Sequence, residues 1–400
     1  MTVTPQFQQS VSKPRRHSRF SLGRVNKPFM GTLAVLVIFG LIIIWAVTLS
    51  SEEYSIMRQI MGVGIGIVLM LIMWKIDYSV FAPAMIPLLV IDVILLLSPH
   101  LPIIGYSAGG ATSWVNIGIR FQPGELAKVV TILLMASIVS RYQGRIDDPK
   151  EYMKCLGVLL VPFLCIMTQP DLGTGLVFLV IGFTILFIGG ANRKLLIITI
   201  VVLIALIALV FLIDPVLDDL FGQDVFLKDY QKNRILVFLD DSIDPTGVGY
   251  NLQQSKIAIG SGGLFGKGIG NATQSSLGFL PEAATDFVFC TIAEQLGFVG
   301  VMFLLVLYSL LFYFSIKMAQ QVTSLFGKLI IMGVCGMWLF QVLENIGMCC
   351  GLMPITGIPL PFISYGSSFM VCNFLCVGLI CSVWSREKSQ PKSVEGFDIK

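Results

Sequence analysis

Ten apolar runs divide this chain of 400 residues, and each approaches the length of a membrane-spanning helix. The hydrocarbon core of a bilayer is about 30 Å thick and requires roughly 20 predominantly apolar residues in a helix. Because lipid cannot satisfy backbone polar groups, such runs are expected to be helical. The sequence therefore predicts an all-α polytopic membrane protein of about ten transmembrane helices. The predicted spans lie near residues 31–50, 56–74, 80–98, 122–140, 154–169, 172–190, 195–213, 286–316, 325–350 and 361–385.

Composition agrees with a membrane protein and excludes several kinds of site. Apolar residues make up 55% of the chain and charged residues 13%, whereas a soluble domain carries about 25% charged residues. His17 and His100 are the only histidines, which excludes histidine-based triads and multi-histidine metal sites. The nine cysteines lie in or beside apolar runs without a CxxC pair, so we interpret them as small buried hydrophobic residues.

The distribution of lysine and arginine predicts the orientation, because these residues are enriched in cytoplasmic connections. Both terminal segments and every second connection are basic, whereas alternate connections such as 51–54 and 351–360 hold almost no basic residues. Both termini are therefore predicted to be cytoplasmic. The predicted division is a cytoplasmic basic tail (1–28), spans one to seven (29–213), a large extracytoplasmic loop (214–285), spans eight to ten (286–385) and a cytoplasmic tail (386–400).

Two predicted outer segments are longer than simple connectors. Residues 99–121 contain Trp114, whose amphipathic ring suits the membrane interface. Residues 214–285 keep apolar side chains, which favours a functional loop. Within this loop, GSGGLFGKGIG (260–270) looks like a phosphate loop, but Ser261 and Gly268 break the Walker pattern. We interpret it as a hinge or a backbone anion site.

Ionisable residues inside the spans are the strongest functional signal, because burying them in a membrane is costly. With the predicted orientation, each lies in the outer half or at the outer end of its span, and the inner halves carry no charge. This asymmetry predicts a polar cavity that opens outward and is sealed below. The residues are Arg58, Asp92, Glu125, Lys128, Asp171, Asp286, Glu294 and Glu344.

Several of these residues allow two interpretations. Glu125 and Lys128 are three residues apart and share a helix face, so they form either a neutralising structural pair or part of an anion site with Arg58. Asp92 requires a partner, for which Arg58 or Lys128 are candidates. Asp171, in the sequence QPDLGTG, either caps the sixth span or binds a metal or phosphate.

Asp286 lies where the large loop enters the membrane, beside Pro281 and Glu282. A helix-capping role is one interpretation of this position. The other is catalytic, because a carboxyl group in apolar surroundings near a cation suits a general base.

Five ordered motifs resemble the SEDS family, the RodA, FtsW and SpoVE polymerases of bacterial peptidoglycan. The resemblance runs from about residue 30 to 386, and two strings, TQSSLGFLPE and GIPLPF, resemble the RodA elongation branch more than the FtsW division branch. The motifs are GATSWVNIGIRFQPGELAK (110–128), QPDLGTG (169–175), DPTGVGYNLQQSKIAIGSGGLFGKG (244–268), TQSSLGFLPEAATDFVF (273–289) and PITGIPLPFISYGSS (354–368).

This resemblance implies a peptidoglycan glycosyltransferase that polymerises lipid II, the undecaprenyl-pyrophosphate-linked disaccharide-peptide, on the outer face of the cell membrane. The essential aspartate of the family falls on Asp286. The sequence departs from the family pattern at Ala284, where a histidine is common, at Gly124, where a serine is common, and at Gln295, the second of two glutamates. The predicted substrate-binding residues are Glu125, Lys128, Arg58, Gln169, Asp171, Glu282, Lys256, Ser364 and Ser367.

The resemblance also implies cofactors and partners. We expect a divalent cation, Mg²⁺ or Mn²⁺, with Asp171 and Asp286 as candidate ligands. The expected partners are lipid II, the nascent glycan strand, membrane lipids and a class B penicillin-binding protein that supplies transpeptidation, with no nucleic acid.

The expected chemistry fits a single carboxylate with nearby cations. A sugar 4-hydroxyl that attacks an anomeric carbon needs one base, and pyrophosphate leaves once its charge is neutralised, unlike the leaving group of a glycosidase. One alternative is a lipid II flippase, which would need polar residues along the whole path rather than charge-free inner halves. A non-enzymatic scaffold is another, although it would not need concentrated outer acids.

Overall fold

The computed structural model describes residues 25–49, 54–102, 104–108, 111–116, 118, 120–169, 171–221, 229–240, 244 and 247–387. Ten of the helices within these ranges coincide with the ten predicted spans, so the prediction of a polytopic helical membrane protein is confirmed. The predicted terminal tails lie almost wholly outside the described residues. The helices are α1 (Lys27–Thr48), α2 (Ile56–Lys75), α3 (Met85–Leu97), α4 (Pro123–Ser140), α5 (Pro149–Met167), α6 (Leu172–Ile188), α7 (Arg193–Phe221), α11 (Val288–Gln321), α12 (Leu325–Cys349) and α13 (Ser367–Glu387).

Length and composition alone would let seven of these helices cross a membrane, and α3 and α6 are shorter apolar helices. Helix α3 is shorter than the third predicted span (80–98). A 3₁₀ turn, η1 (Tyr78–Phe81), and Pro83 precede the helix. A second 3₁₀ turn, η2 (Ser98–His100), extends α3 at its other end. The first two turns of α5 contain Lys150, Glu151 and Lys154, so these charged residues lie at one end of the bundle.

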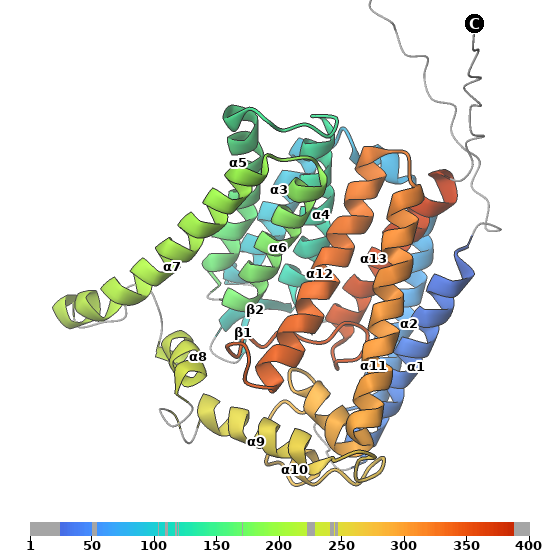
Figure 1. The fold of residues 1–400 in the computed structure, drawn as a ribbon, viewed down its shortest axis with the longest axis vertical. Coiled ribbons are helices and arrows are strands. Elements are labelled where there is room, and N and C mark those ends of the chain that lie inside the picture. Colours follow the sequence, from blue (N-terminus) through green and yellow to red (C-terminus); the bar gives the residue numbers. More distant parts are fainter. Residues whose placement is uncertain are drawn as a thin grey trace, which may run out of the picture.

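The helices pack side by side, with α4, α12 and α13 in the interior (Figure 1). The indole nitrogen of Trp338 on α12 donates to the side-chain oxygen of Asn373 on α13 at 2.7 Å, and both side chains are buried. By contrast, α7 diverges from the bundle and leaves most of its apolar side chains exposed, as expected for a helix that faces lipid.

Helices α2 and α13 approach each other closely, because glycines on both helices face the partner. A Cβ atom added at Gly62 would lie 2.9 Å from the Cα of Ser367, and one added at Gly378 would lie 2.7 Å from the Met70 carbonyl oxygen. Small residues permit such close packing between membrane helices. This packing places the start of α13 against the first turns of α2.

The predicted outer segment 99–121 contains a small antiparallel sheet that the all-α prediction did not include. Its strands are β1 (Gly105–Ala108), β2 (Ala111–Asn116) and β3 (Arg120–Phe121), in that spatial order. Tyr106 pairs with Trp114, and Val115 pairs with Phe121. The strands are too short to show a clear period of two, which explains why the sequence pattern did not reveal them.

The predicted large loop is helical in part and begins within a helix. Helix α7 continues past residue 213 to Phe221, and the buried carboxylate of Asp214 pairs with Lys232 of α8 (Asp229–Leu239) at 3.0 Å. Helices α9 (Val248–Ser261) and α10 (Thr273–Ser276) lie together at one end of the bundle (Figure 1).

The glycine-rich segment 260–270 docks on the start of α11, where Gly297 breaks the helix with a φ of 64°. The carboxylate of Glu294 accepts from the Lys267 ammonium group at 2.6 Å and from the Thr273 backbone nitrogen at 2.9 Å. The anion bound beside the glycine-rich segment is therefore the carboxylate of Glu294 from the same chain. These contacts fix the end of the large loop to α11.

Candidate active site

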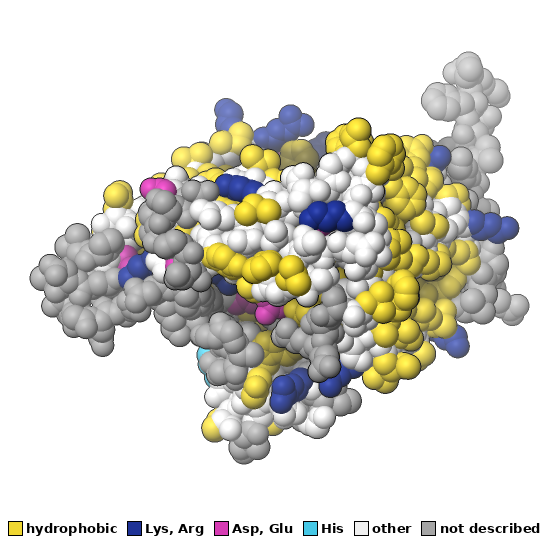
Figure 2. All heavy atoms as spheres, turned by 90° about the horizontal axis from the view of Figure 1, so that it is seen from below, with side chains coloured by type: hydrophobic (Ala, Val, Ile, Leu, Met, Phe, Trp, Pro, Cys, Tyr) yellow, Lys and Arg dark blue, Asp and Glu magenta, His cyan; other side chains and the backbone are white. Residues whose placement is uncertain are grey.

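A cavity of about 1050 Å³ opens at the end of the bundle that carries the sheet, α9 and α10. Figure 2 views this end and shows acidic side chains in a recess, with lysine and arginine side chains around it. The wall combines the N-terminal ends of α2, α4 and α6, the sheet, the segment before α11, the loop between α12 and α13, and the first residues of α13.

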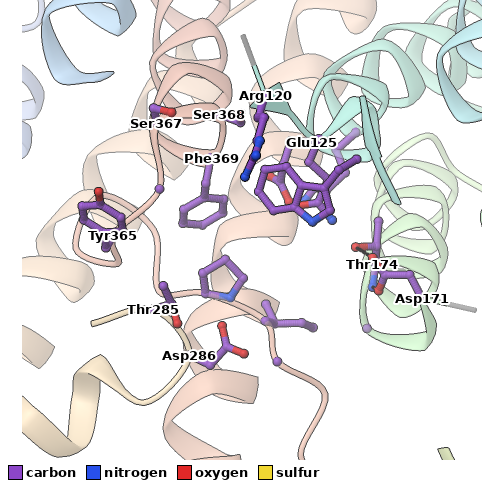
Figure 3. A pocket seen from close by; sticks show the side chains of 18 of the residues that line it. Arg120, Glu125, Asp171, Thr174, Thr285, Asp286, Tyr365, Ser367, Ser368 and Phe369 are labelled. Carbon is purple, nitrogen blue, oxygen red and sulfur yellow. Dashed lines mark hydrogen bonds and ion pairs between the residues drawn. The ribbon is translucent and has the colours of Figure 1, made fainter. Parts of the chain in front are cut away.

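Asp286 reaches this cavity from a tight turn before α11. The backbone nitrogens of Thr285 and Phe287 both donate to the Glu282 carbonyl oxygen at 3.1 Å, and Glu282 has a φ of 53°. The N-cap position of α11 is Phe287, so the capping interpretation of Asp286 does not hold. Its carboxylate instead faces the cavity (Figure 3).

The loop between α12 and α13 holds this turn in place. The hydroxyl of Ser364 donates to the Thr285 carbonyl oxygen at 2.6 Å, and the Tyr365 backbone nitrogen donates to the Ala284 carbonyl oxygen at 2.8 Å. On the other side of the loop, the side chain of Gln59 on α2 donates to the Ser364 carbonyl oxygen at 3.2 Å and accepts from the Gly366 nitrogen at 3.1 Å. The position of Asp286 is therefore fixed by segments far apart in the sequence.

The surroundings of Asp286 favour its protonated form more than water does. Burial raises the pKa of Asp286 to about 7, and the negative charges of Glu282 and Asp171 add to this rise. The Arg234 guanidinium group and the Thr285 hydroxyl group act in the opposite direction. A carboxyl group that titrates near neutral pH is suited to general base catalysis.

Cationic side chains face the same cavity from α2, the sheet and α4. The Lys128 ammonium group lies 2.7 Å from the Glu125 carboxylate, and both side chains are buried. Arg58 and Arg120 also line the cavity, and the Arg120 guanidinium group lies 4.7 Å from the centre of the Tyr106 ring. The predicted Glu125–Lys128 pair therefore exists and also forms part of the cavity wall.

Asp171 caps α6 and also lines the cavity, so its two predicted roles are compatible. Its carboxylate accepts from the Thr174 backbone nitrogen at 2.9 Å and from the Thr174 hydroxyl at 2.8 Å. Asp92 differs from the expectation that Arg58 or Lys128 is its partner. The Thr131 hydroxyl donates to it at 2.7 Å, since Thr131 is the polar residue of α4 at the same depth.

Six of the ten predicted site residues line the cavity, and four have other positions. Gln169 is buried and donates to the Leu96 carbonyl oxygen, while Ser364 is buried among backbone groups. Glu282 is exposed in the turn, and Lys256 is exposed on α9 beside Gly351. The six that line the cavity are Arg58, Glu125, Lys128, Asp171, Asp286 and Ser367.

Sequence reasoning missed several residues of the site. Arg120 lies within the motif that contains Glu125 and was not singled out, although it was a cation beside a predicted outer cavity. Trp114 lines the cavity, whereas the sequence suggested a membrane-interface position. Arg234 of α8 donates to the Thr356 carbonyl oxygen at 3.0 Å and belongs to the surroundings of Asp286. Tyr54 also lines the cavity, as do Thr356, Gly357 and Tyr365, which lie within the motif 354–368 but were not predicted individually.

The fold and the site define a multi-pass helical membrane protein with an acid and several cations in one cavity. A family model described as cell cycle protein, for FtsW, RodA and SpoVE, matches residues 27–389. The chain therefore belongs to the FtsW/RodA/SpoVE family.

Relatives and solved structures agree with this family over most of their length. The chain is 35% identical over 390 residues to the peptidoglycan glycosyltransferase MrdB of Escherichia coli K12, covering 96% of this chain and 100% of that protein. A structure described as a peptidoglycan synthase complex that coordinates polymerisation and crosslinking contains a chain with a TM-score of 0.74 and 28% identity, covering 92% of this chain and 98% of that chain. RodA of Thermus thermophilus has a TM-score of 0.66 and 26% identity, covering 92% of this chain and 97% of that chain.

Proposed function

We propose that this protein is a peptidoglycan glycosyltransferase that polymerises lipid II into glycan strands on the outer face of the cell membrane, for cell elongation and shape. The observation that carries the proposal is the position of Asp286, a carboxyl group with a pKa of about 7 that faces a cavity with cations on its wall. The relatives MrdB of Escherichia coli and RodA of Treponema pallidum are both named peptidoglycan glycosyltransferases, which supports the same activity.

In this reaction Asp286 removes the proton from the 4-hydroxyl group of the acceptor sugar. The hydroxyl oxygen forms a bond to the anomeric carbon of the donor as the bond from that carbon to the pyrophosphate oxygen breaks. The electron pair of the broken bond leaves with undecaprenyl pyrophosphate, and the configuration of the anomeric carbon inverts. A single base is sufficient because the leaving group needs no proton once its charge is neutralised.

The leaving pyrophosphate requires cations opposite the base. Figure 3 shows Asp286 on one side of the cavity and Arg120 with Glu125 on the other, and Lys128 pairs with Glu125. Arginine suits pyrophosphate because its planar group forms paired hydrogen bonds with phosphate oxygens. We assign Arg58, Arg120 and Lys128 to the pyrophosphate and Ser367 to the polar wall beside it.

A divalent cation, Mg²⁺ or Mn²⁺, is part of the proposal. Among the described residues no three His, Cys, Asp or Glu side chains form a ready metal site. Magnesium is commonly held by one or two carboxylates together with substrate phosphates, and Asp171 and Asp286 face the cavity as such donors. The cation would neutralise charge on the pyrophosphate, with Asp171 as its protein ligand.

The proposed orientation follows from charges at the opposite end of the bundle. Arg141 and Arg145 lie between α4 and α5, Lys150 lies in the first turn of α5, and Arg193 and Lys194 lie at the start of α7. Basic connections face the cytoplasm in most membrane proteins, which directs the cavity outward. The partner that we expect is a class B penicillin-binding protein, in line with the complex that contains the structural neighbour.

The alternative of a lipid II flippase has less support from the structure. Beyond Lys128, the buried side chains of α4 are mostly apolar, including Ile132, Leu133 and Met135. A pyrophosphate group could not cross this region without large polar compensation.

Polymerisation of purified lipid II in detergent separates the two functions, because detergent leaves no compartments between which a flippase could act. We expect glycan strands of several disaccharide units from the purified protein, alone or with its class B partner. Absence of polymer in both samples, together with transfer of lipid II across liposome membranes, would contradict the proposed function.

A further inference from the structure

A second cleft lies between α3, α4 and α5, at the end of the bundle opposite the active-site cavity. It encloses about 420 Å³, and no residue of its wall belongs to the cavity that contains Asp286. Most of its wall is apolar, whereas Arg141 and Lys154 lie at one end. The apolar residues of the wall are Met85, Leu89, Ile138, Val158 and Val161.

The two basic side chains come from helix ends that meet across the cleft. Arg141 follows the last turn of α4, Lys154 lies in the second turn of α5, and both are exposed. Neither forms an ion pair with another residue in the described part of the chain. Half-buried Tyr142 completes this end of the cleft, and aromatic rings of this kind suit the level of lipid head groups.

Acidic groups nearby reduce but do not cancel this positive charge. Glu151 lies one turn before Lys154. Burial raises the pKa of Tyr142, and the negative charge of Glu151 contributes to this rise. The Asp148 carboxylate accepts a hydrogen bond from the Lys150 backbone nitrogen and caps α5. The connection also contains Arg145 and Asp147, and Lys150 lies in the first turn of α5. This region therefore contains four basic and three acidic side chains. The two charged side chains that line the cleft, Arg141 and Lys154, are both basic.

The apolar part of the cleft has space for a chain beside α5. A Cβ atom added at Gly157 would meet no other atom within 4 Å, and Gly157 lies in the wall next to Val158. Glycine is unfavourable in a helix interior, and at this position it leaves an open surface.

We propose that this cleft binds an anionic phospholipid of the inner leaflet, with its phosphate between Arg141 and Lys154 and an acyl chain along Gly157, Val158 and Val161. Basic pockets between transmembrane helices on the cytoplasmic side recognise anionic lipid head groups in this way. The assignment of the leaflet rests on the proposed orientation, and the binding itself does not.

Native mass spectrometry of the purified full chain tests the proposal with two lipids of equal chain length, phosphatidylglycerol and phosphatidylcholine. The wild-type protein should retain phosphatidylglycerol in preference to phosphatidylcholine. Arg141→Gln with Lys154→Gln should weaken retention of phosphatidylglycerol by roughly 30-fold, or roughly 5-fold for each basic residue. Lys317→Gln with Lys328→Gln, which removes the same charge at other basic positions, should retain the wild-type preference.

Filling the cleft tests the apolar part without changing charge. Gly157→Leu should reduce retention of both lipids, whereas Gly64→Leu, at an exposed position of α2 with the same free space, should not. Equal retention of the two lipids by the wild type, or wild-type retention by Arg141→Gln with Lys154→Gln, would overturn the proposal. Because the measurement follows lipid retention and not polymerisation, a negative result would leave the assignment as a polymerase unaffected.

Discussion

Asn345 on α12 donates through one amide nitrogen to two carbonyl oxygens, that of Asp286 at 2.7 Å and that of Ile358 at 2.8 Å. The amide is fully buried and connects the turn that presents Asp286 to the loop that lines the cavity beside it. Asn345 is therefore a positioning residue, because it acts on the candidate base through the backbone and does not line the cavity.

Replacing Asn345 by alanine should slow polymerisation by roughly 10- to 100-fold, because a displacement of about 1 Å at a reacting group has an effect of this size. Two carbonyl groups would also lose an amide donor, at about 1–3 kcal/mol for each that is left unsatisfied. Asn373→Ala is the matched control, since Asn373 is a buried asparagine on α13 that bonds Trp338. The control should lower thermal stability but leave the rate per folded molecule near wild type. Equal losses of activity in both variants would argue against a positioning role.

The rate of polymerisation should depend on pH through Asp286. The base acts as a carboxylate, and burial raises its pKa to about 7, so the rate should fall roughly tenfold per unit as the pH drops below about 6. Glu282→Gln removes a negative charge that contributes to this rise, and the midpoint should move to lower pH. Arg234→Gln removes a positive charge that opposes the rise and should move the midpoint to higher pH. Initial rates between pH 5 and 9 check both directions, and an unchanged midpoint in both variants would contradict this account of the site.

Gly357 leaves room for the carboxylate of Asp286. Its φ is 74°, and an added Cβ atom would lie 2.9 Å from an oxygen of that carboxylate. Gly357→Ala should therefore displace Asp286 and reduce the rate of polymerisation at least tenfold. Gly278 has a φ of 73° and nothing within 4 Å of an added Cβ atom, so Gly278→Ala carries the same backbone strain of about 1 kcal/mol without the collision. Comparable rates in the two variants would show that strain, and not contact with Asp286, explains the loss.

Activity should require a divalent cation that Asp171 helps to hold. EDTA should abolish polymerisation, and Mg²⁺ or Mn²⁺ should restore it. Asparagine caps helices as well as aspartate does, so Asp171→Asn should preserve α6 while it raises the Mg²⁺ concentration for half-maximal rate roughly tenfold or more. Full activity in EDTA would remove the metal from the proposal, whereas an unchanged Mg²⁺ requirement in this variant would remove Asp171 as its ligand.

The predicted positions of the spans, and of the charged residues in or beside them, agree with the structure because both can be recognised from local sequence. Asp286, Glu125 and Lys128 stand out since a charge in or beside an apolar run must find a polar environment. Arg120 and Arg234 lie outside the spans, where a positive charge is ordinary, so charge alone does not mark them as site residues, although Arg120 lies within the motif 110–128.

The roles of individual polar residues depend on contacts that are distant in sequence. Ser364 was assigned to the substrate, yet its hydroxyl bonds the carbonyl of Thr285, 79 positions away. Gln169 bonds the Leu96 carbonyl, 73 positions away. Only the packing of α3, α6, α11 and α13 brings these groups together, and one sequence does not contain that information.

The most direct test of the central claim is polymerisation of lipid II by the purified Asp286→Asn variant. Asparagine keeps the size of the side chain and cannot accept the proton, so glycan strands should be absent while thermal stability and lipid II binding stay near wild type. Asp77→Asn, which changes an acid at the opposite end of the bundle, should polymerise normally. Glycan strands formed by Asp286→Asn at the wild-type rate would contradict the assignment of Asp286 as the base.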